Sequence, residues 1–334
     1  MKIGIIGLGM MGRTHYEAYQ EIEDAQVVAI ADQNPKRAKG DLSDTGGNVL
    51  QGGLAQLPMD KIRGTISAFE LIAMKDVDIV DVCVPTTHHT NMAIEALRAG
   101  KHVLCEKPLA RTSADGEKIA AAADTAKGIF MPAMCMRFWP QWAWLKKAVA
   151  DGKYGKVLSA TFRRVAQMPG GWYADGAFSG GAALDLHIHD TDFVQYLFGM
   201  PTAVSSRGYS KTSSETDHVS TQFFYPNIPL VTAEGGWCLA DGYGFTMQYT
   251  INFESATADF DLAREQPLKV SQSGKSEIID CGPGYGYAAE LRYFIECAKS
   301  GKKPTVVTAD DAVRSLKIVE AEVKSVRSGT IVQL

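Results

Sequence analysis

The sequence has few of the features that mark disulfide-rich, metal-clip and exported proteins. Its 6 cysteines stand singly rather than in CxxC pairs, so neither a disulfide framework nor a cysteine metal clip is predicted. No basic region, long apolar core or small-residue cleavage site precedes the first predicted strand, so no export signal is recognisable. We therefore expect a protein of the reducing cytoplasm.

Clusters of charge are also missing. The chain has 34 basic and 38 acidic residues, a formal net charge of −4, and no block of like charges. Because nucleic acid and anionic membranes attract clustered basic side chains, we expect neither as a partner. The sequence shows no internal repeat and no low-complexity tract.

The chain length and the order of the predicted strands and helices indicate two domains. At 334 residues the chain exceeds the size at which a single core usually keeps growing. Apolar runs at 2–6, 26–31, 79–82, 102–105 and 129–134 alternate with helical patterns, which indicates a parallel sheet covered by helices. We predict a doubly wound α/β domain over 1–130.

The alternation of predicted strands and helices ends after about residue 137. Strand-like runs at 157–165, 219–225, 231–238, 245–253 and 257–262 follow one another without helices between them, which is typical of antiparallel sheets. A helix near 142–149 precedes them, and two amphipathic helices close the chain. We predict an α+β domain over 131–334 with a large, mostly antiparallel open sheet. Within the first domain, the glycine-rich segment 41–63 is predicted to be an inserted surface loop.

The first predicted strand breaks into Gly7-x-Gly9-x-x-Gly12 where a helix should begin. Gly7 permits the tight turn, Gly9 lets a pyrophosphate approach the backbone, and Gly12 lets the helix pack on the strand. The first helix amides, which include those of Met10 and Met11, would point at the anion. This context predicts a Rossmann domain that binds a dinucleotide.

The second predicted strand ends at Asp32, twenty residues after Gly12. A carboxylate at this place can accept both hydroxyls of an adenine ribose, and it would repel a 2′-phosphate. Lys36 and Arg37 follow closely, and they keep NADP open as the alternative. We predict NAD as the cofactor.

The loop after the third long strand, Val84 to Thr90, is expected to lie beside the dinucleotide. Pro85 and Thr86 would lie along its ribose and phosphates. Adjacent histidine side chains point in different directions, so we predict a polar contact by His89 rather than a metal pair with His88.

The fourth strand ends in Cys105-Glu106-Lys107-Pro108, at the edge where open α/β sheets bind ligands. A partly desolvated lysine beside a cationic ring could exchange protons near neutrality. The alternative is a surface lysine that caps a loop. Pro108 also admits a cis peptide bond.

A polar helix face is predicted near residue 185. Asp185, His189 and Asp192 are spaced i, i+4 and i+7, so they share a face, whereas His187 points away. A carboxylate can hold a histidine in one tautomer and tune it as a base. A core histidine with capping acids is the alternative. As a metal site the pair lacks a third ligand at useful spacing, so we predict no metal.

Together these motifs resemble the family of glucose-fructose oxidoreductase, inositol dehydrogenase and rhizopine catabolism proteins (Gfo/Idh/MocA). The resemblance runs nearly end to end. It is carried by GLGMMG, VPTTHH, AGKHVLCEKPLA, MRFWP, GKYGKV, ALDLHIHDTD, AELRYFIECAKSGKKP and SVRSGTIV, in that order.

The resemblance implies hydride transfer between nicotinamide and a hydroxyl-bearing carbon of a sugar, polyol or cyclitol. His189 would act as general base, Asp185 would orient it or contact substrate, and Lys107 would steady the alkoxide and relay its proton. The residues expected at the cofactor are Gly7, Gly9, Met10, Met11, Gly12, Asp32, Pro85, Thr86, His89, Glu106, Lys107 and Arg137. Those expected at the substrate are Lys107, Arg137, Trp172, Asp185 and His189, with Tyr173 beside Trp172.

Two other functions stay open at this point. One is an NAD-assisted glycosidase of the same family, and the other is a regulator that binds the dinucleotide and a sugar without turnover. The complete set of Lys107, Asp185 and His189 argues against the regulator. His187 stands where the family often has glycine, and the 41–63 segment is longer than usual, so the substrate is not fixed. The resemblance also implies a homodimer or homotetramer built on the open sheet.

Overall fold

The computed structural model describes residues 1–45 and 54–334, and it divides the chain into two compact units. Unit 1 contains Met1–Cys135 and Tyr285–Val313, and unit 2 contains Met136–Gly284 and Arg314–Leu334. The chain therefore returns to unit 1 late in the sequence. The predicted division, with a single boundary near residue 130, lacks this return. Contacts within unit 1 explain the return, since Lys299 pairs with Asp24 at 2.7 Å.

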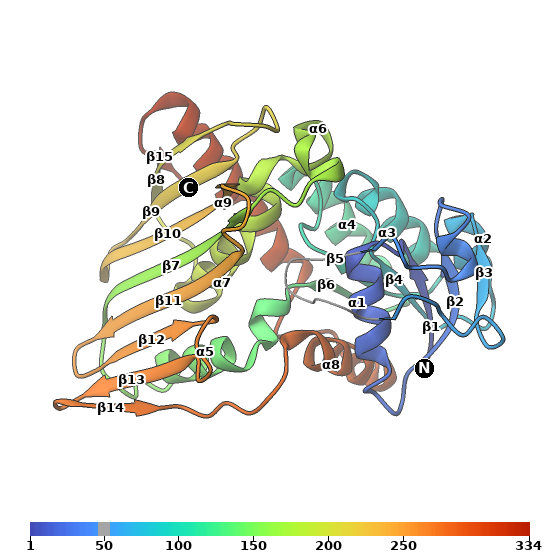
Figure 1. The fold of residues 1–334 in the computed structure, drawn as a ribbon, viewed down its shortest axis with the longest axis horizontal. Helices are drawn as coiled ribbons and strands as arrows, with labels where there is room; N and C mark the ends of the chain where they lie inside the picture. Colours follow the sequence, from blue (N-terminus) through green and yellow to red (C-terminus); the bar gives the residue numbers. More distant parts are fainter. Residues whose placement is uncertain (46–53) are drawn as a thin grey trace. The chain divides into compact units, whose positions relative to one another are not determined.

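Unit 1 is built on a six-stranded parallel sheet (Figure 1). Its strand order is β3-β2-β1-β4-β5-β6, so the order reverses between β1 and β4. Open α/β sheets bind ligands at such a switch point, beyond the carboxyl ends of the strands. The strands are β1 (Lys2–Ile6), β2 (Gln26–Ala31), β3 (Arg63–Thr65), β4 (Ile79–Val82), β5 (His102–Glu106) and β6 (Phe130–Ala133).

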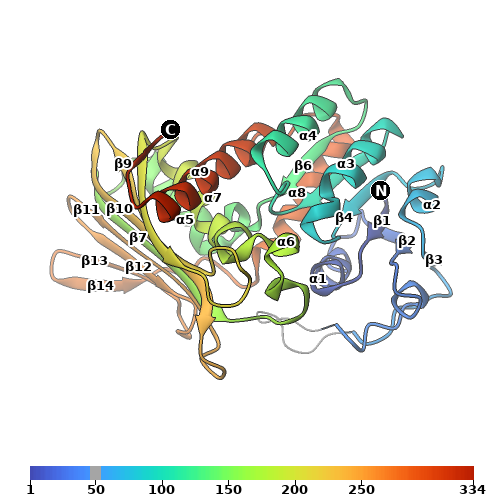
Figure 2. The same cartoon turned by 90° about the horizontal axis from the view of Figure 1, so that it is seen from above.

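Helices cover both faces of this sheet. Figure 2 shows α3 and α4 on one side and α1 on the other. Side-chain caps start two of the helices, because Ser67 accepts from the Glu70 amide and Thr112 from the Asp115 amide. The helices are α1 (Met10–Tyr19), α2 (Ala68–Ala73), α3 (His89–Arg98), α4 (Ser113–Thr125) and α8 (Gly286–Ser300), with short 3-10 turns η1 (Arg37–Lys39) and η2 (Thr86–His88). The predicted doubly wound sheet is confirmed.

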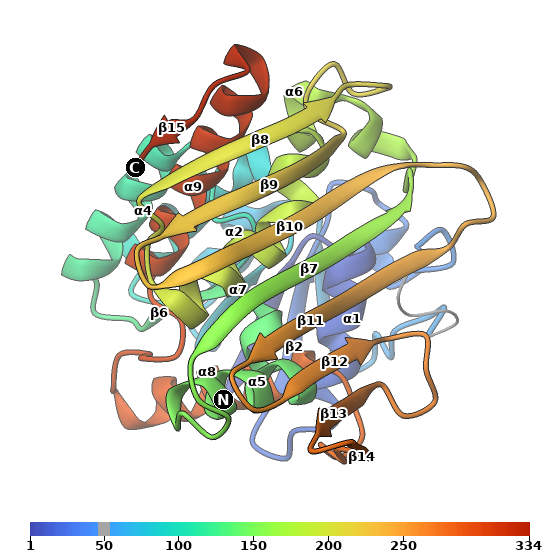
Figure 3. The same cartoon turned by 90° about the vertical axis from the view of Figure 1, so that its left-hand side faces the viewer.

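Unit 2 carries a nine-stranded sheet of order β14-β13-β12-β11-β7-β10-β9-β8-β15 (Figure 3). Neighbours pair antiparallel except β7 and β10, which pair parallel. The mostly antiparallel sheet is confirmed. The strands are β7 (Val157–Gln167), β8 (Ala203–Tyr209), β9 (His218–Tyr225), β10 (Ile228–Leu239), β11 (Phe245–Phe253), β12 (Thr257–Asp261), β13 (Leu268–Gln272), β14 (Lys275–Ile278) and β15 (Val332–Gln333).

Helices pack on one face of the nine-stranded sheet. Trp142 of α5 is fully buried, and its ring lies 4.7 Å from that of Phe193 in α7 and 5.3 Å from that of Tyr249 in β11. Ser325 of α9 accepts the Ser206 amide of β8 at 2.9 Å. The elements are η3 (Cys135–Phe138), α5 (Pro140–Ala150), η4 (Gly171–Ala174), α6 (Gly176–Ser179), η5 (Ala183–His187), α7 (Ile188–Phe198) and α9 (Ala309–Ser328). No helix in the described ranges combines the length and apolarity needed to cross a membrane.

The segment predicted as a surface loop, 41–63, is partly a packed structure. Leu42 and Leu57 are buried, and Asp41 bridges to Gln56 in an isolated antiparallel pair. Most of the other described residues in 41–45 and 54–63 are exposed, so these residues form a surface loop, as predicted, which the buried leucines anchor. The rest of that prediction lies outside the described residues.

Candidate active site

The glycine-rich turn joins β1 to α1 and has the shape of a phosphate cradle. Gly7 has φ +91°, a conformation that favours glycine. A Cβ on Gly12 would lie 1.9 Å from the Gly7 carbonyl oxygen, so only glycine lets α1 pack there. A Cβ on Gly9 would meet nothing within 4 Å. This open space above Gly9 lies at the start of α1, where the first amides of a helix have no intrahelical partner. These residues fit a dinucleotide pyrophosphate.

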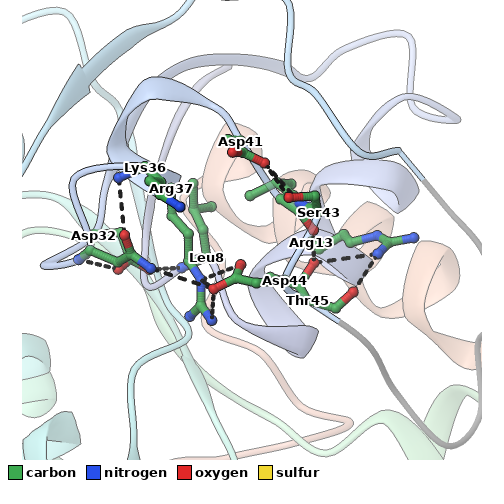
Figure 4. Close-up of polar contacts among 11 residues, drawn as sticks. Leu8, Arg13, Asp32, Lys36, Arg37, Asp41, Ser43, Asp44 and Thr45 are labelled. Atoms are coloured by element: carbon green, nitrogen blue, oxygen red, sulfur yellow. Dashed lines mark hydrogen bonds and ion pairs between the residues drawn. The ribbon is translucent and has the colours of Figure 1, made fainter.

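Asp32 follows β2 and is oriented from the same turn (Figure 4). Its Oδ2 accepts from the Leu8 amide at 2.7 Å, and its Oδ1 accepts from the Asn34 amide at 2.8 Å. The carboxylate is thus fixed next to the cradle, where the fingerprint places an adenine ribose. The nearest basic residue in sequence, Lys36, has an exposed side chain, whereas Arg37 pairs with Asp44 at 2.9 Å.

The loop after β4 is tied to the loop after β5 by a histidine. His89 is 1% exposed, and its Nδ1 lies 2.8 Å from the Pro108 carbonyl oxygen while its Nε2 lies 2.8 Å from that of Val84. Burial lowers the pKa of His89, which favours a neutral ring that donates to one carbonyl. His88 is exposed, Thr86 is buried and Pro85 is half-buried. The predicted polar contact of His89 with the cofactor stays a prediction.

Lys107 comes directly after β5, at the carboxyl edge of the sheet. Its amide donates to Glu106 Oε2 at 3.0 Å, and the Lys107–Pro108 peptide bond is cis. The side chain is half-buried. Glu106 itself is buried, and its Oε1 lies 3.0 Å from His15 Nε2. Lys107 is therefore carried by a backbone that a buried ion pair fixes.

That ion pair belongs to a cluster that sequence reasoning missed. His15 Nδ1 lies 2.9 Å from Asp81 Oδ2, which also accepts from the Tyr19 hydroxyl at 3.0 Å. Burial, the largest single effect, lowers the pKa of His15, but Asp81 and Cys83 together raise this pKa well above its ordinary value. The imidazolium thus links α1, β4 and β5. The signal was available, since Asp81 interrupts an otherwise apolar strand.

His15, Asp81 and Cys83 are also the one group among the described residues whose ligand atoms lie close enough to hold a metal ion. The His15 and Asp81 atoms that would bind it are hydrogen-bonded to each other, and burial raises the pKa of the Cys83 thiol. A metal needs the thiolate. The geometry therefore favours a hydrogen-bonded cluster.

In unit 2, Asp185 and His189 lie on consecutive but different helical elements. Asp185 is buried in the π-helical turn η5, and His189 is half-buried in the first turn of α7. The predicted helix thus exists, but its π turn breaks the regular i, i+4 spacing between them. His187 points elsewhere, as expected, and its Nε2 lies 3.1 Å from Glu322.

Asp192 does not join Asp185 and His189 as a reactive group. Both its oxygens are engaged by Arg137, at 2.9 Å through Nε and 2.7 Å through Nη2, and Ser315 donates to it at 2.9 Å. Arg137 is 3% exposed, and its guanidinium lies 4.4 Å from the ring of Tyr196. The pair fixes α7 to η3. The predicted ligand contacts of Arg137 stay predictions.

Trp172 and Tyr173 lie together on η4. Their ring centroids are 4.1 Å apart and stacked, and Tyr173 meets Trp237 edge to face at 5.9 Å. Trp237 is buried and donates its indole N–H to Asp217 at 2.9 Å. The stacked pair therefore rests on the nine-stranded sheet, and both of its rings remain half-buried.

The parallel sheet, the open glycine turn and the oriented acid define a dinucleotide-binding Rossmann domain. A family model described as "Oxidoreductase family, NAD-binding Rossmann fold" matches residues 1–134, and one described as "Oxidoreductase family, C-terminal alpha/beta domain" matches 146–334. The chain belongs to the Gfo/Idh/MocA oxidoreductase family. The predicted family is confirmed.

Two relatives match this chain over nearly their full length. Myo-inositol 2-dehydrogenase of Thermotoga maritima is 28% identical, with 100% of this chain and 98% of the relative covered. scyllo-Inositol 2-dehydrogenase (NAD(+)) of Bacillus subtilis is 24% identical, with 100% and 96% covered. Among solved structures, the aldose-aldose oxidoreductase from Caulobacter crescentus complexed with glycerol is 25% identical, with a TM-score of 0.85 and 100% and 99% covered. This chain is an NAD-dependent dehydrogenase that acts on CH–OH groups.

A second solved structure supports the fold. Levoglucosan dehydrogenase in complex with NADH and levoglucosan is 23% identical, with a TM-score of 0.86 and coverage of 100% of this chain and 99% of that chain. The predicted cofactor, NAD, is confirmed by the matching NAD-binding family model.

Proposed function

We propose that this dehydrogenase oxidises a ring or chain hydroxyl of a sugar, polyol or cyclitol. The observation that carries the proposal is Lys107, which follows β5 at the ligand-binding edge of an NAD-binding sheet and has its amide held by Glu106. The full-length relatives named as inositol dehydrogenases support the substrate class.

In this proposal Lys107, Asp185 and His189 are the catalytic residues. His189 accepts the hydroxyl proton, while the carbon loses its hydrogen with both bonding electrons and becomes a carbonyl. Bound NAD supplies the acceptor for that hydride. The Lys107 ammonium stabilises the negative charge that develops on the substrate oxygen, and Asp185 orients His189 or the substrate. Trp172 offers an aromatic face to the substrate.

The helix that carries His189 is held by buried ion pairs. Arg164 binds Asp190 through Nε at 2.9 Å and Nη2 at 3.1 Å, next in sequence to His189. Asp190 is fully buried and Arg164 is 3% exposed. General-base catalysis needs the base within hydrogen-bond reach of the proton, so a rigid α7 supports the assignment of His189.

A substrate screen tests the function. Purified protein with NAD⁺ is given aldoses, cyclitols and amino sugars, and NADH formation is followed at neutral and alkaline pH. We expect NADH with at least one cyclitol or sugar. Cleavage of a glycoside without net NADH would instead identify the NAD-assisted glycosidase, and binding without turnover of any compound would identify the regulator.

Three substitutions test the residues. Lys107→Ala and His189→Ala should each lower kcat by about 10²-fold or more, in line with losing general acid–base catalysis. Lys118→Ala is the matched control, because Lys118 is an exposed lysine of unit 1 that pairs with Asp115, three residues away. Unchanged oxidation in both Lys107→Ala and His189→Ala would contradict the catalytic assignment.

We also propose that the protein is a cytoplasmic homodimer or homotetramer. The nine-stranded sheet supports this, because Leu158 of β7 and Leu230 of β10 are 39% and 42% exposed. All 6 cysteines are free, which suits a reducing compartment. Light scattering at working concentration should give twice or four times the 36.2 kDa chain mass. A monomer would contradict the assembly.

A further inference from the structure

We propose that Asp44 is a second determinant of NAD preference, because it holds the Arg37 guanidinium that would otherwise receive the 2′-phosphate of NADP. The proposal rests on the NAD-dependent activity and adds a residue to its cofactor selectivity. It involves only unit 1, and the residues concerned are drawn in Figure 4.

Arg37 lies where an NADP-binding arginine is needed. It begins η1, five residues after Asp32, and Asp32 exerts an electrostatic effect on its guanidinium. In dinucleotide folds an acid after the second strand binds the ribose 2′-hydroxyl, whereas a nearby arginine accommodates a 2′-phosphate. This chain has both groups, so Asp32 alone does not settle the preference.

Asp44 occupies the guanidinium of Arg37 in a two-pronged geometry. Arg37 Nε lies 3.0 Å from Asp44 Oδ1, and Nη2 lies 2.9 Å from Oδ2. Asn34, whose amide holds Asp32, also donates its side chain to Asp44 Oδ2 at 3.4 Å. Hydrogen bonding to Asp44 raises the pKa of Arg37, and the same contact lowers the pKa of Asp44. A phosphate would have to displace a bidentate carboxylate partner.

The turn that carries Asp44 is anchored on both sides. Leu42 is fully buried, and Ser43 donates its amide to Asp41 Oδ1 at 3.1 Å. On the other side, Arg13 Nη1 donates to the Thr45 carbonyl at 2.8 Å. Since Arg13 belongs to α1, the helix of the phosphate cradle also fixes the position of Asp44.

The charge balance follows from this arrangement. Asp32, Asp44 and Arg37 together carry one net negative charge, so within this group the charge of Arg37 is already balanced and does not favour a 2′-phosphate. Without Asp44, Arg37 is available and one negative charge is removed. Both changes favour NADP, while the hydroxyls that NAD offers to Asp32 are unaffected.

The test compares dissociation constants of NADP⁺ and NAD⁺ by calorimetry on Asp44→Asn and wild type. We expect Asp44→Asn to tighten NADP⁺ binding about tenfold, which corresponds to about 1.4 kcal/mol, and to change the NAD⁺ constant less than twofold. The gain should shrink at high salt, because the attraction is electrostatic. Thermal unfolding of each variant, which should match wild type, verifies that the fold is retained.

Two further variants separate the specific pair from a general charge effect. Asp41→Asn is the matched control, since it removes an acid from the same turn that contacts Ser43 and not Arg37; it should leave NADP⁺ affinity unchanged. Arg37→Ala in the Asp44→Asn background should abolish the gain. An unchanged NADP⁺ constant in Asp44→Asn, an equal gain in Asp41→Asn, or a gain that survives loss of Arg37 would each overturn the proposal. A protein that binds neither dinucleotide would instead contradict NAD dependence itself.

Discussion

Alanine substitutions at two glycines of the dinucleotide turn, Gly9 and Gly12, should have different effects on folding stability and on NAD⁺ binding. A methyl group added at Gly9 meets nothing within 4 Å, whereas one added at Gly12 falls 1.9 Å from the Gly7 carbonyl oxygen. Gly9 has φ −74°, which any residue adopts. Gly9→Ala should therefore fold normally, and Gly12→Ala should not.

The magnitudes follow from these two environments. At Gly9, alanine is a poorer helix N-cap than glycine, which lowers folding stability by about 0.5 kcal/mol. Alanine also reduces the conformational entropy of the unfolded chain, which raises folding stability by about the same amount. The methyl group occupies the space that a phosphate must enter, which costs about one hydrogen bond to a charged group, about 1.5–3 kcal/mol. NAD⁺ affinity should fall about 10- to 150-fold. Gly12→Ala forces α1 away from the turn and should cost about 1–3 kcal/mol of folding stability.

Calorimetry of NAD⁺ binding and thermal unfolding without cofactor give the two readouts. We expect Gly9→Ala to keep the wild-type Tm and lose affinity, and Gly12→Ala to lose both. The reasoning is refuted if Gly9→Ala binds NAD⁺ like wild type. It is equally refuted if Gly9→Ala lowers Tm as much as Gly12→Ala does.

Three further predictions concern buried groups. Because the pKa of His15 is raised in the folded protein, its imidazolium stabilises the fold fully below the unfolded pKa of about 6.5, and this stabilisation is lost as the pH rises through the folded pKa. In urea unfolding, the difference in unfolding free energy between wild type and His15→Asn should therefore shrink by up to about 1.4 kcal/mol per pH unit between those two pKa values. A difference that grows with pH would contradict this. Asp190→Asn leaves the buried Arg164 without its charged partner and should cost about 3–5 kcal/mol by denaturant unfolding, whereas a loss below about 1 kcal/mol would show that the pair is dispensable. Trp142→Ala empties the centre of the aromatic core of unit 2 and should cost about 3–5 kcal/mol; a wild-type unfolding midpoint would disprove that role.

Much of the fold was predictable from local patterns. The strands β1, β2, β4 and β11 have the predicted bounds, since each is a continuous or alternating apolar run bounded by turns. The strands that were missed are β3, β8, β13, β14 and β15. β3 and β15 are only three and two residues long and β14 is exposed along its whole length, whereas β8 and β13 are partly buried strands whose composition alone did not mark them. All five are strands because they pair with a neighbour in a sheet. The return of α8 to unit 1 could not be predicted for the same reason, because the sequence of an amphipathic helix does not specify which element its apolar face packs against.

The sequence by itself determined the cofactor class, because the glycine turn and Asp32 act through local backbone geometry that their spacing encodes. It also placed Lys107 after a strand, since the strand and the turn adjoin in sequence. Only the tertiary structure decided which charges neutralise each other. Arg37 is held by Asp44, Asp192 by Arg137, and His15 lies between Asp81 and Glu106. Which charges pair depends on distances between segments that are remote in sequence. Burial strengthens the dependence of the interaction energy on those distances, because it lowers the local dielectric constant.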